Sequence, residues 1–397
     1  MSVLEINYEN EQLFFKVHPS IYNNDIFYIA PIQQDIKKIF NLQRNKLFKM
    51  GGQAKRWVLL NEQQECIGRI AAFINPKTVQ SQNMKVGGIG FFECINNQEA
   101  ANQLFETAVA WLKSEQMEAL DGPINFGERD QFWGLLVDNF QVFNSYGLNY
   151  NPPYYQQLFE NFGFKTYFEQ YVFWRSLDRD VENIFKIKGK EMLQNPNFKV
   201  INAEHLNKDQ IAHYFLEVYN SAWSGIAGFK EMRLEQAQNV VKSLWPIIDK
   251  RIIFFAMMKD KAIGFFINIP ELNEFFQYVN GNMNWWGKLK FFYHFKTKKR
   301  NRLVGIVFGV DREYHGKGVD GAIIIKAGEM VVKTNLYQET IMTWVGDFNL
   351  PMLKVVNELG VERLKTLITY RYLFDRNQIF ERYPYVGKGK KTENNVE

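Results

Sequence analysis

The chain has 397 residues, of which 46% are hydrophobic and 16% aromatic, and its formal net charge is +5. This length exceeds one ordinary hydrophobic core and suits two domains, while the modest charge argues against bulk nucleic-acid binding. The two cysteines, Cys66 and Cys94, lack metal or redox spacing, and no run approaches about 18 apolar residues. With a polar N-terminus, these features favour a cytoplasmic protein without a metal site.

The first half alternates helical and strand-like patterns. Apolar residues at helical spacing predict a helix over 33–48, and a polar turn between two apolar runs predicts a hairpin over 56–75. Asn96 or Asn97 is a suitable N-cap for a second helix. The remaining patterns predict strands over 85–95, 119–126 and 165–174, and helices over 96–116 and 152–164.

The second half repeats this order. Its patterns predict helices over 207–223, 231–245, 319–334 and 349–360, a hairpin over 251–269, and strands over 303–310, 339–345 and 362–374. We therefore expect an internal duplication of one α/β (α+β) unit with a mostly antiparallel mixed sheet. The expected domains are 1–176 and 195–385, followed by a disordered polar tail over 386–397.

A charged loop with Gly316, Gly318 and Gly321 joins the strand over 303–310 to the helix that follows. The spacing matches the dinucleotide fingerprint Gly-x-Gly-x-x-Gly, which belongs at the first turn of a βαβ unit. Too few residues follow Asp347 for the remaining strands of such a domain, and the preceding hairpin demands an antiparallel sheet. We therefore set the dinucleotide interpretation aside.

Residues 195–375 instead resemble the GCN5-related N-acetyltransferase (GNAT) family in their order of elements and in this loop. The family loop reads Gln/Arg-x-x-Gly-x-Gly/Ala and wraps the pyrophosphate of coenzyme A with backbone N–H groups at a helix N-terminus. Here Glu313 occupies the first position of that motif. The resemblance implies acetyl-CoA or another acyl-CoA as donor, bound by Val310, Arg312, His315, Gly316, Lys317, Gly318, Val319 and Asn349.

The first half has the same order of elements but no Gly-x-Gly at 94–99, so we expect a degenerate copy that binds no coenzyme A. Four of its segments resemble a group of bacterial tandem acyltransferase-like proteins without an assigned substrate. These segments are 68–75, 121–126, 134–140 and 150–164.

Transfer of an acyl group to an amine requires a polarised carbonyl, a deprotonated amine and a proton for the leaving thiolate. Many GNAT members carry a Tyr acid seven residues after the Asn that corresponds to Asn349, but here that position is Val356. Tyr370 and Tyr372 are nearby substitutes in the sequence. Asp347 and His315 are candidates for the base, although Asp347 also suits an N-cap and His315 a phosphate-loop role.

The acceptor side of the family lies between the first two helices. There, Asn220, Trp223 and Phe229 suggest a pocket wall, and the alternative is a loop packed on the other half. The segment 282–302 interleaves six aromatic with seven basic residues and contains no acid. It suits peripheral membrane contact, a lid over an acyl chain, or an interface helix with a solvated basic face, and we expect no specific nucleic acid.

The sequence thus predicts an acyl-CoA-dependent N-acyltransferase that acts on a small or lipid-like amine. The alternatives are a non-catalytic acyl-CoA or lipid-binding protein on the same scaffold, and a transferase that uses acyl-carrier protein or aminoacyl-tRNA as donor. Leu at Gly318 is expected to abolish coenzyme A binding while the fold survives.

Overall fold

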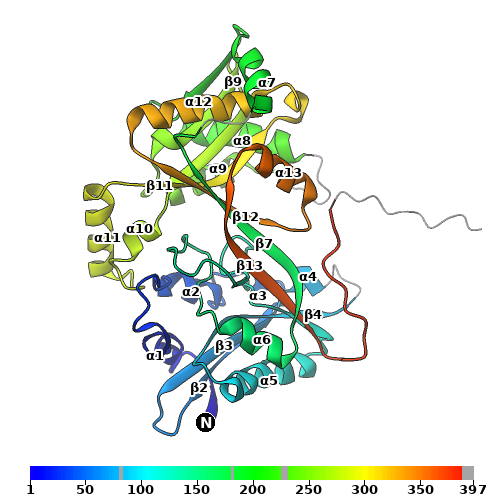
Figure 1. Ribbon diagram of the computed structural model, residues 1–397. Coiled ribbons are helices and arrows are strands. Elements are labelled where there is room, and N and C mark those ends of the chain that lie inside the picture. The colour runs from blue at the N-terminus through cyan, green and yellow to red at the C-terminus, as the bar shows by residue number, and fades with distance from the viewer. Residues whose placement is uncertain (80–83, 180–182, 225–230, 387–397) are drawn as a thin grey trace, which may run out of the picture.

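The computed structural model describes residues 1–79, 84–179, 183–224 and 231–386 (Figure 1). Within these ranges one sheet of 13 strands runs through the molecule in the order β1-β2-β3-β4-β5-β13-β7-β12-β11-β10-β9-β8, and β6 pairs with β13. Figure 1 shows the two halves at opposite ends, with the long strands β7 and β13 between them. The predicted mixed α/β class is confirmed.

The first half starts with short elements that precede a hairpin. Residues 33–48 form two helices rather than the single predicted one, because the Asn41 side chain accepts from the backbone of Gln43 and Arg44 and Asn45 caps the second helix. The elements are β1 (Ser2–Glu5), η1 (Glu11–Phe15), α1 (His18–Tyr22), α2 (Gln33–Ile39), α3 (Lys46–Lys49), β2 (Gln53–Leu60), β3 (Cys66–Ile74), α4 (Pro76–Val79), β4 (Val86–Cys94), α5 (Gln98–Ser114), β5 (Ala119–Gly122), β6 (Leu135–Leu136), α6 (Tyr155–Phe162) and β7 (Lys165–Ser176).

The second half follows the predicted order and adds two helices, α7 and α10, that the sequence did not reveal, while α11 lies in segment 282–302, where an interface helix was one alternative. Its elements are α7 (Asn183–Leu193), β8 (Phe198–Asn202), α8 (Lys208–Trp223), α9 (Leu234–Leu244), η2 (Lys250–Ile252), β9 (Ile253–Met258), β10 (Lys261–Pro270), α10 (Asn273–Phe276), α11 (Trp285–Thr297), β11 (Arg302–Val310), η3 (Arg312–Tyr314), α12 (Val319–Thr334), β12 (Glu339–Gly346), α13 (Leu350–Glu358) and β13 (Glu362–Leu373). Residues from 387 onward, where the disordered tail was predicted, lie outside the described ranges.

The two halves exchange their last strands. β13, the end of the second half, pairs antiparallel with β5 of the first half and with β7. β7, the end of the first half, pairs in turn with β12 of the second. Each half therefore completes its sheet with a strand from the other, so no cut at one chain position yields two sheets with their observed neighbours.

Helices cover both faces of the second-half sheet. Phe254, Ala256 and Ile263 pack with α12, whereas the alternate residues Phe255 and Phe265 pack with α8 and α9. α7 lies along α12, and a Cβ added to Gly189 would sit 2.7 Å from the carbonyl carbon of Gly321. The third glycine of the loop motif therefore serves a close helix crossing.

Two carboxylates fix the segment around α10: Glu271, just before the helix, reaches the first half, and Glu274 lies within the helix. Glu271 accepts hydrogen bonds from the backbone N–H of Tyr146 (2.9 Å) and Asn273 (2.9 Å). Glu274 accepts from the backbone N–H of Asn301 (3.1 Å) and Arg302 (3.1 Å), at the start of β11. Burial raises the pKa of Glu274 to about 7, with a further contribution from the neighbouring Glu271.

This raised pKa predicts a pH-dependent stability. The folded protein takes up an extra proton at Glu274 between the ordinary glutamate pKa and about 7, so this stabilisation is complete at low pH and lost as pH rises through 7. We expect Glu274→Gln to show a smaller loss of melting temperature between about pH 5 and pH 8 than the wild type. Glu62→Gln, in an exposed hairpin turn, is the control and should keep the wild-type slope. An unchanged slope in Glu274→Gln would contradict the assignment.

Candidate functional site

A cleft opens where two parallel strands separate. β11 and β12 pair only over Arg302–Gly305 and Glu339–Met342. Beyond Gly305 they diverge and leave a cleft of about 900 Å³. Gly305 and Val307 pair with the consecutive residues Asn268 and Ile267 of β10, which leaves Ile306 without a partner on that strand. Ile306 therefore forms a β-bulge in β11. The bulged backbone therefore stands at the point where the cleft begins.

The walls of the cleft are mainly apolar and come from β10, β11, β12, α12 and α13. Five of its large apolar side chains are 36–47% exposed, which leaves apolar surface facing an open space. Such a concave apolar surface is typical of a ligand site. The five are Ile306, Phe308, Val332, Met352 and Val355.

Asn268 adds a polar group to this wall. The residue is fully buried, and its amide Nδ2 donates to the carbonyl of Ile252 (2.9 Å). Its Oδ1 has no hydrogen-bond partner in the described part of the chain. A buried acceptor without a partner is costly in a folded protein, so this oxygen suits a donor supplied by a ligand or by water.

The predicted glycine loop lies between β11 and α12, as the sequence indicated. Val310 ends the strand, Gly318 (φ +84°) is the N-cap of α12, and Val319 is the first helical residue. The ring Nε2 of His315 lies 3.0 Å from the carbonyl oxygen of Val310, so this side chain braces the loop. The side chains of Arg312, Glu313, His315 and Lys317 are exposed.

α7 lies over this loop, which sequence reasoning missed because residues 176–195 were treated as a joint. The Nζ of Lys188 donates to the carbonyl of Gly316 (3.4 Å), and a Cβ added to Gly318 would lie 2.3 Å from the carbonyl oxygen of Lys188. Lys186 and Lys190 line the cleft. The available signal was the basic alternation Lys-Ile-Lys-Gly-Lys at 186–190.

Asn349 lies on the opposite side of the cleft, where it caps α13 and accepts from the N–H of Met352 (3.3 Å). Asp347, proposed as a base, does not line the cleft within the described residues. Its carboxylate instead accepts a hydrogen bond from Arg382 (2.6 Å). Burial nevertheless raises the pKa of Asp347.

Tyr370, proposed as the acid, is far from this cleft. Strand exchange places it in the first-half core, where it is fully buried and donates to Glu160 (3.0 Å). Burial beside Glu160 raises its pKa far above the ordinary value. We therefore do not assign Tyr370 to the chemistry of the cleft. Val356 is also fully buried.

The proposed acceptor residues lie on the α8 face of the sheet, opposite α12. Trp223 stacks on Phe265 (ring centroids 6.0 Å apart) and fills the space above Gly309. The Asn220 side chain exchanges two hydrogen bonds with the backbone of Met232. Both residues support the segment between α8 and α9, and Phe229 lies outside the described residues.

The first half has a comparable bulge but no comparable cleft. Arg69 and Ala71 of β3 pair with Glu93 and Gly90 of β4, so β4 has one residue more than β3 between these two pairs. Within this bulge, Phe91 takes a positive φ of 54°. The chain after β5 returns across this place, with the N–H of Ile124 bonded to the carbonyl of Ile89 (2.7 Å). The space that is open in the second half is thus occupied by the protein's own backbone.

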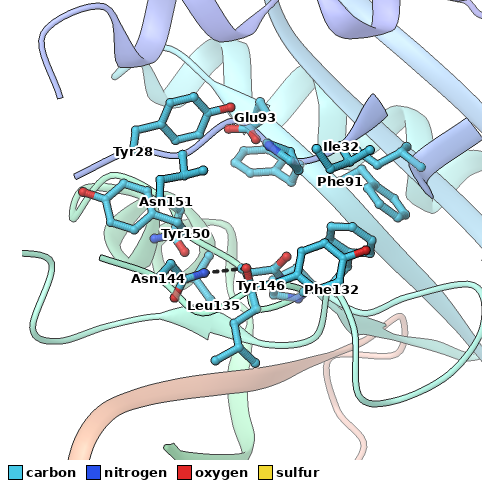
Figure 2. Close-up of a pocket in the computed structure, with 18 of the residues that line it drawn as sticks. Tyr28, Ile32, Phe91, Glu93, Phe132, Leu135, Asn144, Tyr146, Tyr150 and Asn151 are labelled. Carbon is cyan, nitrogen blue, oxygen red and sulfur yellow. Dashed lines mark hydrogen bonds between the residues drawn. The ribbon is translucent and has the colours of Figure 1, made fainter. Parts of the chain in front are cut away.

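A small pocket of about 70 Å³, which we call the chamber, is lined mainly by first-half residues (Figure 2). Glu93 borders it and accepts from Tyr22 (2.7 Å), Tyr155 (2.8 Å) and Arg69 (3.3 Å). Burial raises the pKa of Glu93, against the opposing effect of Arg69. Such a volume holds only a few water molecules, so the chamber suits a structural polar network better than a substrate site.

No known protein-family model matches the chain. Among curated proteins, the chain is 24% identical over 310 residues to "Bacterial ceramide synthase" of Caulobacter vibrioides (strain NA1000 / CB15N), which covers 77% of this chain and 80% of that protein. It is 21% identical over 369 residues to "Protein YghO" of Escherichia coli (strain K12), which covers 92% and 93%. Among solved structures, a tandem GNAT protein from the clavulanic acid biosynthesis pathway matches with a TM-score of 0.52 and 10% identity over 94% of this chain and 98% of that chain.

The chain therefore has the tandem GNAT fold that its glycine loop and order of elements resembled. The comparisons further support an acyltransferase. No cluster of three or more His, Cys, Asp or Glu side chains in the described ranges is placed to hold a metal ion. None of the helices in those ranges is both long and apolar enough to cross a membrane.

The contact between α7 and the glycine loop can be tested with two alanine variants. Gly316 and Gly318 both have positive φ (73° and 84°), which costs a residue with a Cβ roughly 1–2 kcal/mol. A Cβ at Gly316 meets nothing within 4 Å, whereas one at Gly318 meets the Lys188 backbone. We expect Gly318→Ala to lower the melting temperature clearly more than Gly316→Ala. Equal melting temperatures would show that α7 does not cover the loop.

This geometry corrects one sequence-based expectation. Leu at Gly318 would overlap the backbone of Lys188, so loss of coenzyme A binding in that variant would not separate a cofactor effect from disturbed packing.

Proposed function

We propose that this protein transfers a long acyl chain from acyl-coenzyme A to the amine of a lipid-like acceptor, with the donor in the β11–β12 cleft. The observation that carries the proposal is a large apolar cleft that begins at a bulged strand and extends along α12 to Asp320, in the first turn after the glycine loop. A thioester with a phosphorylated end and an apolar end matches both regions.

The loop suits the phosphates of the donor. Backbone N–H groups at the start of α12 and the helix dipole favour an anion there. Arg312 and Lys317 add positive charge from the loop, and Lys188 and Lys190 add it from α7. Glu313 is exposed, so its carboxylate is free to turn toward solvent.

The cleft suits a chain longer than acetyl. Its volume of about 900 Å³ is at the upper end of the range for small-molecule sites. Exposed apolar side chains from α12, α13 and β11 supply the surface that a hydrocarbon chain buries. The similarity to a protein named bacterial ceramide synthase supports this choice, because a ceramide is by definition the amide of a long-chain base and a fatty acid.

The reaction forms one bond and breaks one. The neutral amine nitrogen attacks the thioester carbonyl carbon, the C–S bond breaks, and the thiolate leaves and takes up a proton. Backbone polar groups at the Ile306 bulge are suited to polarise the carbonyl. Three carboxylates that line the cleft, Asp178, Asp320 and Glu329, are the candidates that would take the amine proton.

Gly328 provides a sharp test of the donor site. It lies on α12, lines the cleft, and has nothing within 4 Å of an added Cβ. We expect Gly328→Phe to fill the cleft and lower activity with a 16-carbon acyl-CoA by about tenfold or more, since about 1.4 kcal/mol of lost chain burial is a factor of ten. Activity with acetyl-CoA should change little. The assay follows thiol release and amide formation with a panel of long-chain amines.

The controls keep this result specific. Gly328→Ala should leave the chain-length preference unchanged and slightly stabilise the helix. Lys333→Phe, at an exposed position of the same helix, should behave like the wild type. Equal losses with both donors would contradict a long-chain site, and tight acyl-CoA binding without turnover would favour a non-catalytic binding protein. Turnover only with an acyl-carrier protein or aminoacyl-tRNA would show that this molecule, and not acyl-coenzyme A, is the donor.

A further inference from the structure

α11 exposes an unusual number of large apolar side chains. Trp285, Trp286 and Tyr293 are each 64% exposed, Leu289 is 47% exposed and Phe292 is 37% exposed. All five lie on one helix of 13 residues. Exposed apolar residues are ordinary when they are scattered, but a contiguous group of this size marks an interaction surface.

The helix is apolar on two separate faces. Gly287, Phe291 and Phe295 are buried, and the two phenylalanines pack on α10, where the rings of Phe276 and Phe291 lie 4.8 Å apart. At about 100° per residue, the five exposed side chains form a second stripe of about 120° that points away from this contact. A helix that is apolar on most sides is normally buried on most sides, and α11 is buried on one.

The second stripe is edged by positive charge. Lys288 and Lys290 flank it at the N-terminal end, and Lys296, Lys298 and Lys299 follow at the C-terminal end; all five are exposed. Residues 282–302 contain no acid. Arg300 and Arg302 are instead engaged by Asp249 (2.7 Å) and Glu339 (2.6 Å). The lysines therefore present a net positive surface around the aromatic stripe.

We propose that α11 docks this protein on an anionic phospholipid bilayer, with the tryptophans in the headgroup region and the lysines on lipid phosphates. Tryptophan and tyrosine suit the boundary between water and hydrocarbon because each ring has an apolar body and a polar group. Lysine side chains reach from a helix lying in that boundary to the phosphates.

Other partners fit these features less well. An acidic protein would explain the lysines but would not call for two adjacent exposed tryptophans, whose ring centroids lie 4.6 Å apart. Single-stranded nucleic acid would stack on the rings but gains nothing from Leu289. The buried face of α11 holds the helix on the protein surface, so docking needs no separate folding step. The inference depends on α11 alone and not on the contents of the cleft.

The test is co-sedimentation of the full chain with vesicles. Binding is expected to vesicles of phosphatidylcholine with phosphatidylglycerol, to weaken as salt is raised, and to be weak with phosphatidylcholine alone. Lys288→Glu with Lys290→Glu should lower partitioning by about thirtyfold or more, since each lysine near an anionic surface contributes about fivefold. Trp285→Ala with Trp286→Ala should weaken binding to a similar degree and leave less salt-resistant binding.

Matched controls lie elsewhere on the surface. Lys199→Glu with Lys242→Glu makes the same charge change at two exposed positions, and Tyr8→Ala with Ile26→Ala removes two exposed apolar side chains. Both should bind as the wild type does, and all variants should keep the wild-type melting temperature. No vesicle binding at low salt, or equal loss in the controls, would overturn the proposal. So would a dimer that the tryptophan variant dissociates, or RNA binding that outcompetes vesicles.

Discussion

The parting of β11 from β12 after Gly305 is the feature on which the site depends. Parallel strands normally continue side by side, so something must draw one of them away. β12 is held on its far side by β7, first at Ser176–Phe173 and, after a register shift, at Tyr171 and Gln170. β7 is fixed in turn by β13. The exchange of last strands between the halves therefore anchors one wall of the cleft, and the Ile306 bulge bends the other.

In both halves a bulged strand separates from its parallel neighbour, but the space between the two strands is filled in one half and open in the other. Both bulged strands leave a parallel neighbour, but in the first half the returning backbone at Ile124 crosses close to Gly90, where an added Cβ would lie 2.0 Å from the Ile124 carbonyl oxygen. Glu93 is then sealed in by hydrogen-bonding partners. In the second half no such chain returns between β11 and β12 within the described ranges, and Asn268 keeps an unpaired oxygen. The two halves thus contain one filled and one open version of a similar gap.

Sequence patterns predicted what is local. The glycine loop, the Asn349 cap and the order of strands and helices follow from backbone preferences and spacing, which act over a few residues. The exchange of β7 and β13 could not be predicted, because either strand fits either edge by pattern alone. That exchange moved Tyr370 into the core of the other half. The direction of the Asp347 side chain also could not be predicted, because Asp347 follows the last residue of β12.

The residues that sequence reasoning missed share one property: their role depends on apolar surface that no other element of the described structure covers. Gly328 and Val332 have the spacing of a buried helix face, and only the separation of the strands exposes them. α11 likewise has apolar side chains on two faces, but only one of these faces is buried against other described residues. Burying apolar surface is worth roughly 25 cal/mol per Å², so leaving it open gives up stability that the fold had the residues to gain. Natural folds accept such losses mainly at functional surfaces. The cleft and the exposed face of α11 both belong to the half that has the glycine loop, which is where a protein that handles acyl chains would need them.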